Sequence, residues 1–182
     1  MLRGKRINLR LIRKNDLDEM FDLISEVKSR GDNFHLNLFS EPGQQKQFTE
    51  TGFWSDELYR LLITDKKDRK IGSIQFWQPV SYFACFEIGY LLFSPKDWGK
   101  GYMTETVNLL VPYIFETHPI ERIQAATLVD NIGSQKVIEK CGFSPEGTMR
   151  KVVFHRGQYE DLKMFSILRA ESGPLSAQWQ DE

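Results

Sequence analysis

The stretch from Ser94 to Leu110, SPKDWGKGYMTETVNLL, places two glycines directly before a run of apolar residues with helical spacing. The apolar run from Tyr82 to Phe93 predicts a strand before it. A glycine turn between a strand and a helix leaves the amides of the first helical turn free, and an anion can approach them because no Cβ intervenes. Gly99 and Gly101 therefore predict either a diphosphate site or a tight turn, and their spacing alone leaves both open.

Composition limits the classes of function. The 182 residues are 41% hydrophobic and 27% charged, a balance typical of a globular protein. The net charge is -1 and no basic block is present, which argues against nonspecific nucleic-acid binding. The longest candidate membrane segment, Leu109 to Phe115, is too short to span a bilayer. We expect a cytoplasmic protein with no nucleic-acid or membrane partner.

Cysteines and histidines lack the spacing of a metal site. Cys85 and Cys141 are not part of a CxxC motif, and His35, His118 and His155 lie far apart in the sequence. Free thiols and no metal are therefore expected.

Hydrophobic periodicity predicts an α+β chain with a mostly antiparallel sheet. Alternating residues predict strands at 6–12, 58–64, 71–77, 82–93, 120–129, 147–154 and 159–168. Helices are predicted from Asn15 to Gly31, after Gly101 and over 130–142, with a loop and one short helix between 32 and 53. We expect one domain over residues 1–170 and a loose tail over 171–182 that includes Trp179.

The glycine stretch resembles a known motif. Lys96-x-x-Gly99-x-Gly101 is similar to the Q/R-x-x-G-x-G/A motif of the GCN5-related N-acetyltransferase (GNAT) superfamily, whose turn amides bind the pyrophosphate of acetyl-CoA. Lys96 departs from the usual Gln or Arg. The segments 86–105, 131–150 and 157–167 also resemble the branch that acetylates ribosomal proteins at their N-termini. The matching positions in the last two segments are Asn131, Ser134, Glu139, Lys140, Gly142, Phe143, Glu146, Gly147, Arg150, Gly157, Tyr159 and Asp161.

This resemblance covers residues 5 to 169 and implies a fold and a co-substrate. The family fold is a twisted, mostly antiparallel sheet of six to seven strands, with splayed fourth and fifth strands and about four flanking helices. Acetyl-CoA is the implied co-substrate, and no metal is implied. The residues expected to contact it are Leu91, Leu92, Phe93, Lys96, Trp98, Gly99, Lys100, Gly101, Tyr102, Met103, Asn131 and Ser134.

Glu87 and Ser134 are the candidate catalytic residues. Glu87 is a carboxylate in an otherwise apolar strand beside the expected cleft, so it can take a proton from the amine; alternatively it faces solvent or pairs with a cation. Many family members carry, at the position of Ile138, a tyrosine that serves as the acid near the departing sulfur, so this chain lacks the usual acid. The resemblance places Ser134 near the thioester sulfur, where its hydroxyl can donate a hydrogen bond to the thiolate. Asn131 can cap its helix and bind the cofactor arm.

The acceptor is the least constrained part of the interpretation. The residues expected to line its groove are Phe34, His35, Phe53, Trp54 and Tyr159, although aromatic residues here can equally cover the core. The resemblance implies a protein N-terminal α-amine as acceptor. A small-molecule amine (polyamine, amino sugar or antibiotic), a non-catalytic acetyl-CoA-binding module and a structural protein are the alternatives, as a monomer or a homodimer.

Overall fold

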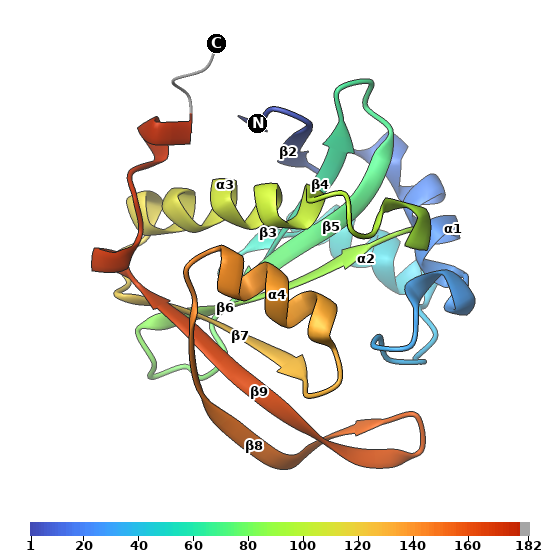
Figure 1. Cartoon of the computed structure of the whole chain (residues 1–182). Helices are drawn as coiled ribbons and strands as arrows, with labels where there is room; N and C mark the ends of the chain where they lie inside the picture. The colour runs from blue at the N-terminus through green and yellow to red at the C-terminus, as the bar shows by residue number, and fades with distance from the viewer. Residues whose placement is uncertain (179–182) are drawn as a thin grey trace.

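The computed structural model describes residues 1–178, whose strands form one sheet (Figure 1). Across this part of the chain the strand order is β1-β2-β4-β5-β6-β7-β9-β8, with β3 paired to β4. The strands are β1 (Leu2–Arg3), β2 (Ile7–Leu11), β3 (Trp54–Ser55), β4 (Leu58–Asp65), β5 (Lys70–Trp77), β6 (Cys85–Leu92), β7 (Arg122–Leu128), β8 (Ser144–His155) and β9 (Gln158–Leu168). The α-helices are α1 (Leu17–Ser25), α2 (Glu41–Thr51), α3 (Tyr102–Thr117) and α4 (Ile132–Lys140).

The predicted fold class is confirmed. The sheet of residues 1–178 has nine strands, but β1 and β3 contain only two residues each, so seven long strands remain. All paired strands are antiparallel except β6 and β7, which run parallel. The 3-10 helices η1 (Lys14–Asp16), η2 (Val27–Arg30), η3 (Pro95–Asp97), η4 (Arg169–Glu171) and η5 (Leu175–Gln178) connect or extend the main elements.

The two ends of the first predicted helix differ from expectation. Asn15 lies inside η1 rather than capping α1, and the helix begins after Asp16. It ends at Ser25, and Gly31, with φ of +75°, follows η2 instead. The short helix expected between 32 and 53 is α2.

The helices cover opposite faces of the sheet (Figure 1). Because side chains alternate along a strand, each strand contributes to two cores. On one face α3 and α4 supply residues such as Val107, Leu110 and Ile138 to the larger core. On the other face α1 and α2 pack through Met20 and Phe48 around the fully buried Phe53. A ligand that passes through the sheet would therefore meet two different layers.

Strands β6 and β7 are paired over only three residues, from Cys85 and Arg122 to Glu87 and Gln124. Beyond Glu87, β6 continues to Leu92 and β7 to Leu128 without pairing to each other. These are the fourth and fifth strands of the sequence prediction, and they splay as the family resemblance implies.

The expectation of a loose end after Arg169 is wrong for residues 171–178. Leu175 is only 5% exposed, and its amide donates to Glu116 Oε1 of α3 at 2.7 Å. Arg169 donates to the carbonyl oxygens of His118 at 2.8 Å and of Ile120 at 2.9 Å. This segment therefore packs on α3, whereas Trp179 lies outside the described residues.

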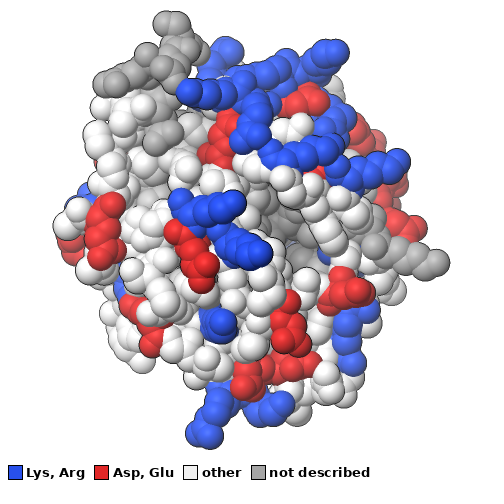
Figure 2. Space-filling view, viewed as in Figure 1, with Lys and Arg blue, Asp and Glu red and all other residues white. Residues whose placement is uncertain are grey.

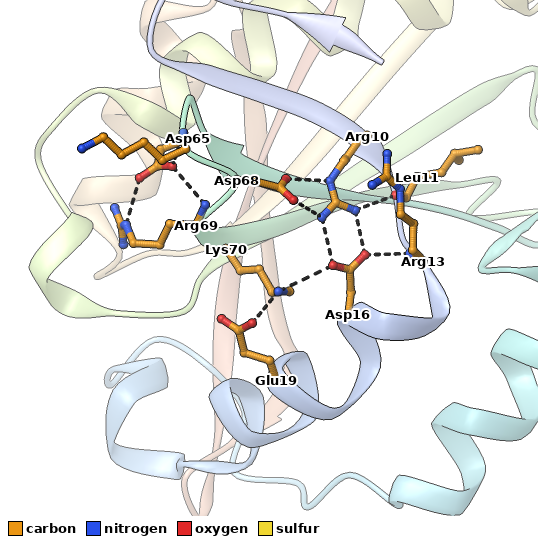
Figure 3. Close-up of polar contacts among 10 residues, drawn as sticks. Arg10, Leu11, Arg13, Asp16, Glu19, Asp65, Asp68, Arg69 and Lys70 are labelled. Atoms are coloured by element: carbon orange, nitrogen blue, oxygen red, sulfur yellow. Dashed lines mark hydrogen bonds and ion pairs between the residues drawn. The ribbon is translucent and has the colours of Figure 1, made fainter.

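A buried ion pair fastens α1 to the sheet (Figure 3). Arg10 of β2 donates to both carboxylate oxygens of Asp16, at 2.7 and 2.9 Å, and its Nε donates to Asp68 at 3.0 Å. Burial raises the pKa of Asp16, but hydrogen bonds from Arg10 and from the Arg13 amide lower it more, and the net shift is downward. Lys70 Nζ lies 3.6 Å from Asp16. The pair thus fixes the α1–α2 layer against its face of the sheet.

We expect Asp16→Asn to destabilise the protein by about 3 kcal/mol at pH 7, because it leaves a buried guanidinium without its main partner. The carboxylate contribution is fully present above the ordinary pKa of 3.8 and is lost as the pH falls through the lower folded value. Urea unfolding at pH 7 and at lower pH measures both effects. The control Asp68→Asn changes an exposed partner of Arg10 and should cost about 1 kcal/mol or less. Equal losses in the two variants would contradict this role of Asp16.

Candidate active site

A cleft of about 390 Å³ opens where β6 and β7 part. Its lining comes from both faces of the sheet. Tyr90 and Thr127 belong to the α3–α4 face, beside Asn131, the N-cap residue of α4, and Ser134 of α4. The lining residues of the α1–α2 face are Arg60, Ser73, Gln75 and Gly89. Segment 33–39 and the β8–β9 hairpin contribute Phe34, His35, Phe39, Val153, Phe154 and His155. The cleft therefore runs through the sheet.

The glycine turn lies at the start of α3. Gly99 and Gly101 have φ of +71° and +77°, in the left-handed region that costs other residues about 1–2 kcal/mol. A Cβ on Gly99 would meet open space, whereas one on Gly101 would meet the Arg6 guanidinium at 2.9 Å. The first amides of α3 have no partner within the helix. The turn thus requires glycine for its backbone, and it also leaves room for an anion beside free N–H groups.

Basic side chains surround this helix start. Figure 2 shows Lys and Arg gathered over the β4–β5 hairpin and the adjacent N-terminal strands. The exposed basic residues of these segments are Arg3, Lys5, Arg6, Lys66, Lys67 and Arg69. Arg6 itself donates to the carbonyl oxygens of Lys100 at 2.5 Å and of Gly101 at 3.3 Å. The free amides, the open space and the positive charge suit the diphosphate of acetyl-CoA.

Several residues predicted to contact acetyl-CoA have other surroundings. Phe93 and Met103 are buried in the two cores, and Trp98 covers Gly31, where a Cβ would lie 2.4 Å from its ring. Tyr102 is half-buried beneath the Arg6 guanidinium. The side chains of Phe93 and Met103 therefore fill the core, so any contact that these residues make with acetyl-CoA has to come from the backbone.

The backbone of β6 offers hydrogen-bond donors to the cleft, but they come from Tyr90 and Leu92 rather than from the whole predicted stretch of Leu91 to Phe93. The Phe93 amide donates to the Ile71 carbonyl of β5 at 2.9 Å, so it is not free for a ligand. Because donors alternate between the two edges of a strand, the amides of Leu92 and Tyr90 point to the edge that faces the cleft. These are the groups that can hold the pantetheine arm and stabilise an oxyanion.

Tyr90 and Ser134 form a hydroxyl pair inside the cleft. Their oxygens lie 2.8 Å apart, and the Asn131 side chain accepts from the Ser134 amide at 3.1 Å to cap α4. Burial raises the pKa of Tyr90 above its ordinary value, so the phenol stays protonated and can donate. Ile138 lies fully buried in the core. Sequence reasoning missed Tyr90, although its alternation with Ile88 along β6 could have indicated its face.

Glu87 occupies the closed end of the splay, in the last pair of β6 and β7. It is half-buried, and its Oε2 accepts from Gln124 Nε2 at 2.7 Å. Burial raises the pKa of Glu87, and the hydrogen bond from Gln124 offsets part of that rise. It lies two residues before Gly89 on the same face of the strand, at the apex of the cleft rather than along its lining. A carboxylate with a raised pKa suits a general base.

The predicted acceptor residues divide into two groups. Phe34 and His35 line the cleft, and burial, followed by the charge of Arg30, lowers the pKa of His35. Phe53 is 1% exposed in the core, and Trp54 packs edge-to-face on Tyr59. Tyr159 is 60% exposed beside Phe154. The groove assignment is therefore corrected for Phe53, which fills the core, and Trp54 packs on Tyr59 outside the cleft lining. Tyr159 is the register partner of Phe154, a lining residue, so its place in the groove stays a prediction.

The β8–β9 hairpin and segment 32–39, which we call the acceptor segment, are joined across the cleft. His155 Nε2 lies 2.8 Å from the Asp32 carbonyl oxygen, and Arg156 Nε donates to the same oxygen at 2.9 Å. Within residues 1–178 no cluster of His, Cys, Asp or Glu has the arrangement to hold a metal ion. None of the helices described is long and apolar enough to cross a membrane.

Comparisons with known proteins agree with this geometry. The family description "Acetyltransferase (GNAT) domain" matches residues 6–144. The chain belongs to the GNAT acetyltransferase family. YjcK of Bacillus subtilis, a probable N-acetyltransferase, is 35% identical over 179 residues, which covers 94% of this chain and 98% of the relative. The chain is thus an N-acetyltransferase of the GNAT type.

More distant relatives do not fix the acceptor. The ribosomal-protein-serine acetyltransferase of Escherichia coli is 23% identical and covers 88% of this chain and 91% of its own length. Spermidine N-acetyltransferase of Vibrio cholerae, solved with CoA and spermine, has a TM-score of 0.80 at 21% identity, over 91% of this chain and 97% of that chain. This likeness shows the shared fold, and the ribosomal-protein branch stays a prediction.

We expect acetyl-CoA at about 100 times Kd to stabilise the wild type by about 2.7 kcal/mol, which corresponds to a rise in Tm of roughly 5–10 °C. Gly99→Glu should abolish this rise, because a carboxylate would occupy the open space and repel the diphosphate. Gly157→Glu is the matched control, since Gly157 also has positive φ (+91°) and open space but lies in the β8–β9 turn. A rise that survives in Gly99→Glu would place the diphosphate elsewhere.

Proposed function

We propose that the protein transfers the acetyl group of acetyl-CoA to a primary amine, and that this amine is the N-terminus of a protein. The observation that carries the proposal is the cleft through the sheet at the parting of β6 and β7. It joins the hydroxyl pair on the α3–α4 side to the acceptor segment on the α1–α2 side. Two reactants that enter from opposite faces can therefore meet without an acyl-enzyme.

On the α3–α4 side, this chain's residues bind and orient the thioester. The turn at Gly99 and Gly101 receives the diphosphate, and the free edge of β6 receives the pantetheine arm. The amides of Tyr90 and Leu92 are placed to donate to the thioester oxygen as negative charge develops there. Asn131 fixes the start of α4 and with it the position of Ser134.

On the α1–α2 side, the amine gives up a proton and attacks. Glu87 receives that proton through a bridging water, because it sits at the apex of the cleft rather than along its lining. A carbon–nitrogen bond forms, the carbon–sulfur bond breaks, and the departing thiolate takes a proton. The Tyr90–Ser134 pair can supply it, with Ser134 as the relay between the phenol and the sulfur.

A test of this function is the release of CoA thiol from acetyl-CoA in the presence of peptide amines, spermidine and an amino sugar. We expect release with a peptide amine and a product acetylated at its N-terminus, detected by mass spectrometry. If only the small amines support turnover, the acceptor is a small-molecule amine and not the N-terminus of a protein. Tight acetyl-CoA binding without turnover on any amine would indicate a binding module and reject catalysis.

The pH dependence of the same assay tests Glu87. The base acts when ionised, so kcat should fall as the pH drops through the pKa of Glu87, which lies above the ordinary value of 4.5. Glu87→Gln should lower kcat by about 10²-fold and remove this fall. His35→Gln is the control, because His35 lines the cleft and its pKa is lowered below the ordinary value of 6.5. If the fall disappears in His35→Gln and persists in Glu87→Gln, the histidine is the base.

A further inference from the structure

Arg60 places a positive charge in the acceptor half of the cleft. Its register partner is Gln75, whose own partner is Gly89, so the three residues form one row on the α1–α2 face. Arg60 Nε donates to Gln75 Oε1 at 3.1 Å, Nη1 donates to Gln44 Oε1 at 3.2 Å, and the guanidinium stacks over Phe53 at 4.9 Å. These neutral partners hold the cation in place without neutralising it.

The other guanidiniums that donate hydrogen bonds to side chains each have a carboxylate partner. Arg6 pairs with Glu105, Arg10 with Asp16, Arg69 with Asp97, and Arg122 with Glu146. Arg60 has no such carboxylate among the described residues, and burial alone lowers its pKa, with no acidic group opposing the shift. Its two hydrogen bonds to glutamines use two of five N–H donors.

The rest of the cleft lining adds no negative charge. Besides Arg60, its ionisable residues are His35, His155 and Tyr90, and no Asp or Glu lies among the lining residues described. The carboxylate nearest in register is Glu87, which lies at the apex of the cleft, two residues before Gly89 on β6. Such a site is poorly matched to a polyamine, because every additional ammonium would approach a guanidinium.

A second guanidinium reinforces this charge from beneath the acceptor segment. Arg30 is 3% exposed and lies over the rings of Phe34 and Phe39 at 5.8 and 5.1 Å. Its Nη1 donates to the carbonyl oxygens of His35 and Asn37, while Nε and Nη2 are buried without a partner among the described residues. Its charge helps to lower the pKa of His35 in the cleft.

We infer that the acceptor carries a carboxylate close to its primary amine, and that Arg60 binds this carboxylate. The inference rests on the proposed transferase function and narrows its substrate class. A guanidinium with free donors in a planar fork can bind a carboxylate through two hydrogen bonds, which would also orient the neighbouring amine toward the thioester. The carboxylate can belong to a free amino acid or to an acidic residue at the start of a peptide, because both present the same chemistry.

The test compares acceptors that differ only in this charge. The probes are the peptide amides Asp-Ala-Ala-Ala and Asn-Ala-Ala-Ala, free L-aspartate and spermidine, assayed by thiol release with wild type and Arg60→Gln. We expect wild type to prefer the Asp peptide over the Asn peptide at least tenfold in kcat/KM, mainly through KM. Arg60→Gln should reduce this preference to less than threefold by weakening the Asp peptide alone. Preference for L-aspartate over the Asp peptide would identify a free amino acid as the source of the carboxylate.

Two controls separate charge recognition from structure. Lys46→Gln removes an exposed cation from α2, where Lys46 pairs with Glu50 at 3.9 Å, and should leave the preference unchanged. Arg60→Lys keeps the charge without the fork and should retain part of the preference, which keeps the test decisive if Arg60→Gln folds poorly. Equal losses on both peptides, or spermidine as the best acceptor, would overturn the inference while the transferase function stands. If the wild type binds acetyl-CoA but releases no thiol with any of these acceptors, the proposed function itself is rejected.

Discussion

The short pairing of β6 and β7 is the constraint on which the site depends. After three paired residues the strands separate, and the inner edge of β6 is left with backbone donors and acceptors that no strand satisfies. Buried backbone groups require partners, so this edge is suited to an extended ligand with amide groups of its own. The opening also removes the barrier between the two faces of the sheet. A reaction centre therefore arises at the place where regular pairing ends.

The two layers differ in what they present to this opening. The α3–α4 layer supplies a glycine turn, free helix amides and the Tyr90–Ser134 pair, which suit a diphosphate and a thiolate. The α1–α2 layer is held to the sheet by the Arg10–Asp16 pair, and on this face Arg60 of β4 and aromatic rings line the cleft. The carboxylate-bearing acceptor that we infer from this charge would differ from the polyamine named for the Vibrio structure of similar fold. Fold and acceptor class are thus set by different parts of the molecule.

The sequence predicted the parts of the fold that depend on local pattern. Strand alternation, the glycine turn and the Asn131 cap are local signals, and each lies where it was expected. The Tyr90–Ser134 pair joins residues 44 positions apart, and the Arg60–Gln75 pair depends on strand register, so neither follows from spacing. Phe53 and Leu175 look like surface or tail residues in the sequence, but packing buries them. Register and layer packing therefore decide which polar residues face the cleft.

The central claim is that the cleft carries the two reactants from opposite faces to one point. A crystal structure of the protein with CoA tests it most directly. The account predicts the diphosphate at the Gly99–Gly101 turn, the arm along the free edge of β6, and the sulfur within hydrogen-bond distance of the Ser134 or Tyr90 hydroxyl. A CoA molecule whose arm lies outside the gap between β6 and β7, with its sulfur remote from both hydroxyls, would contradict the account.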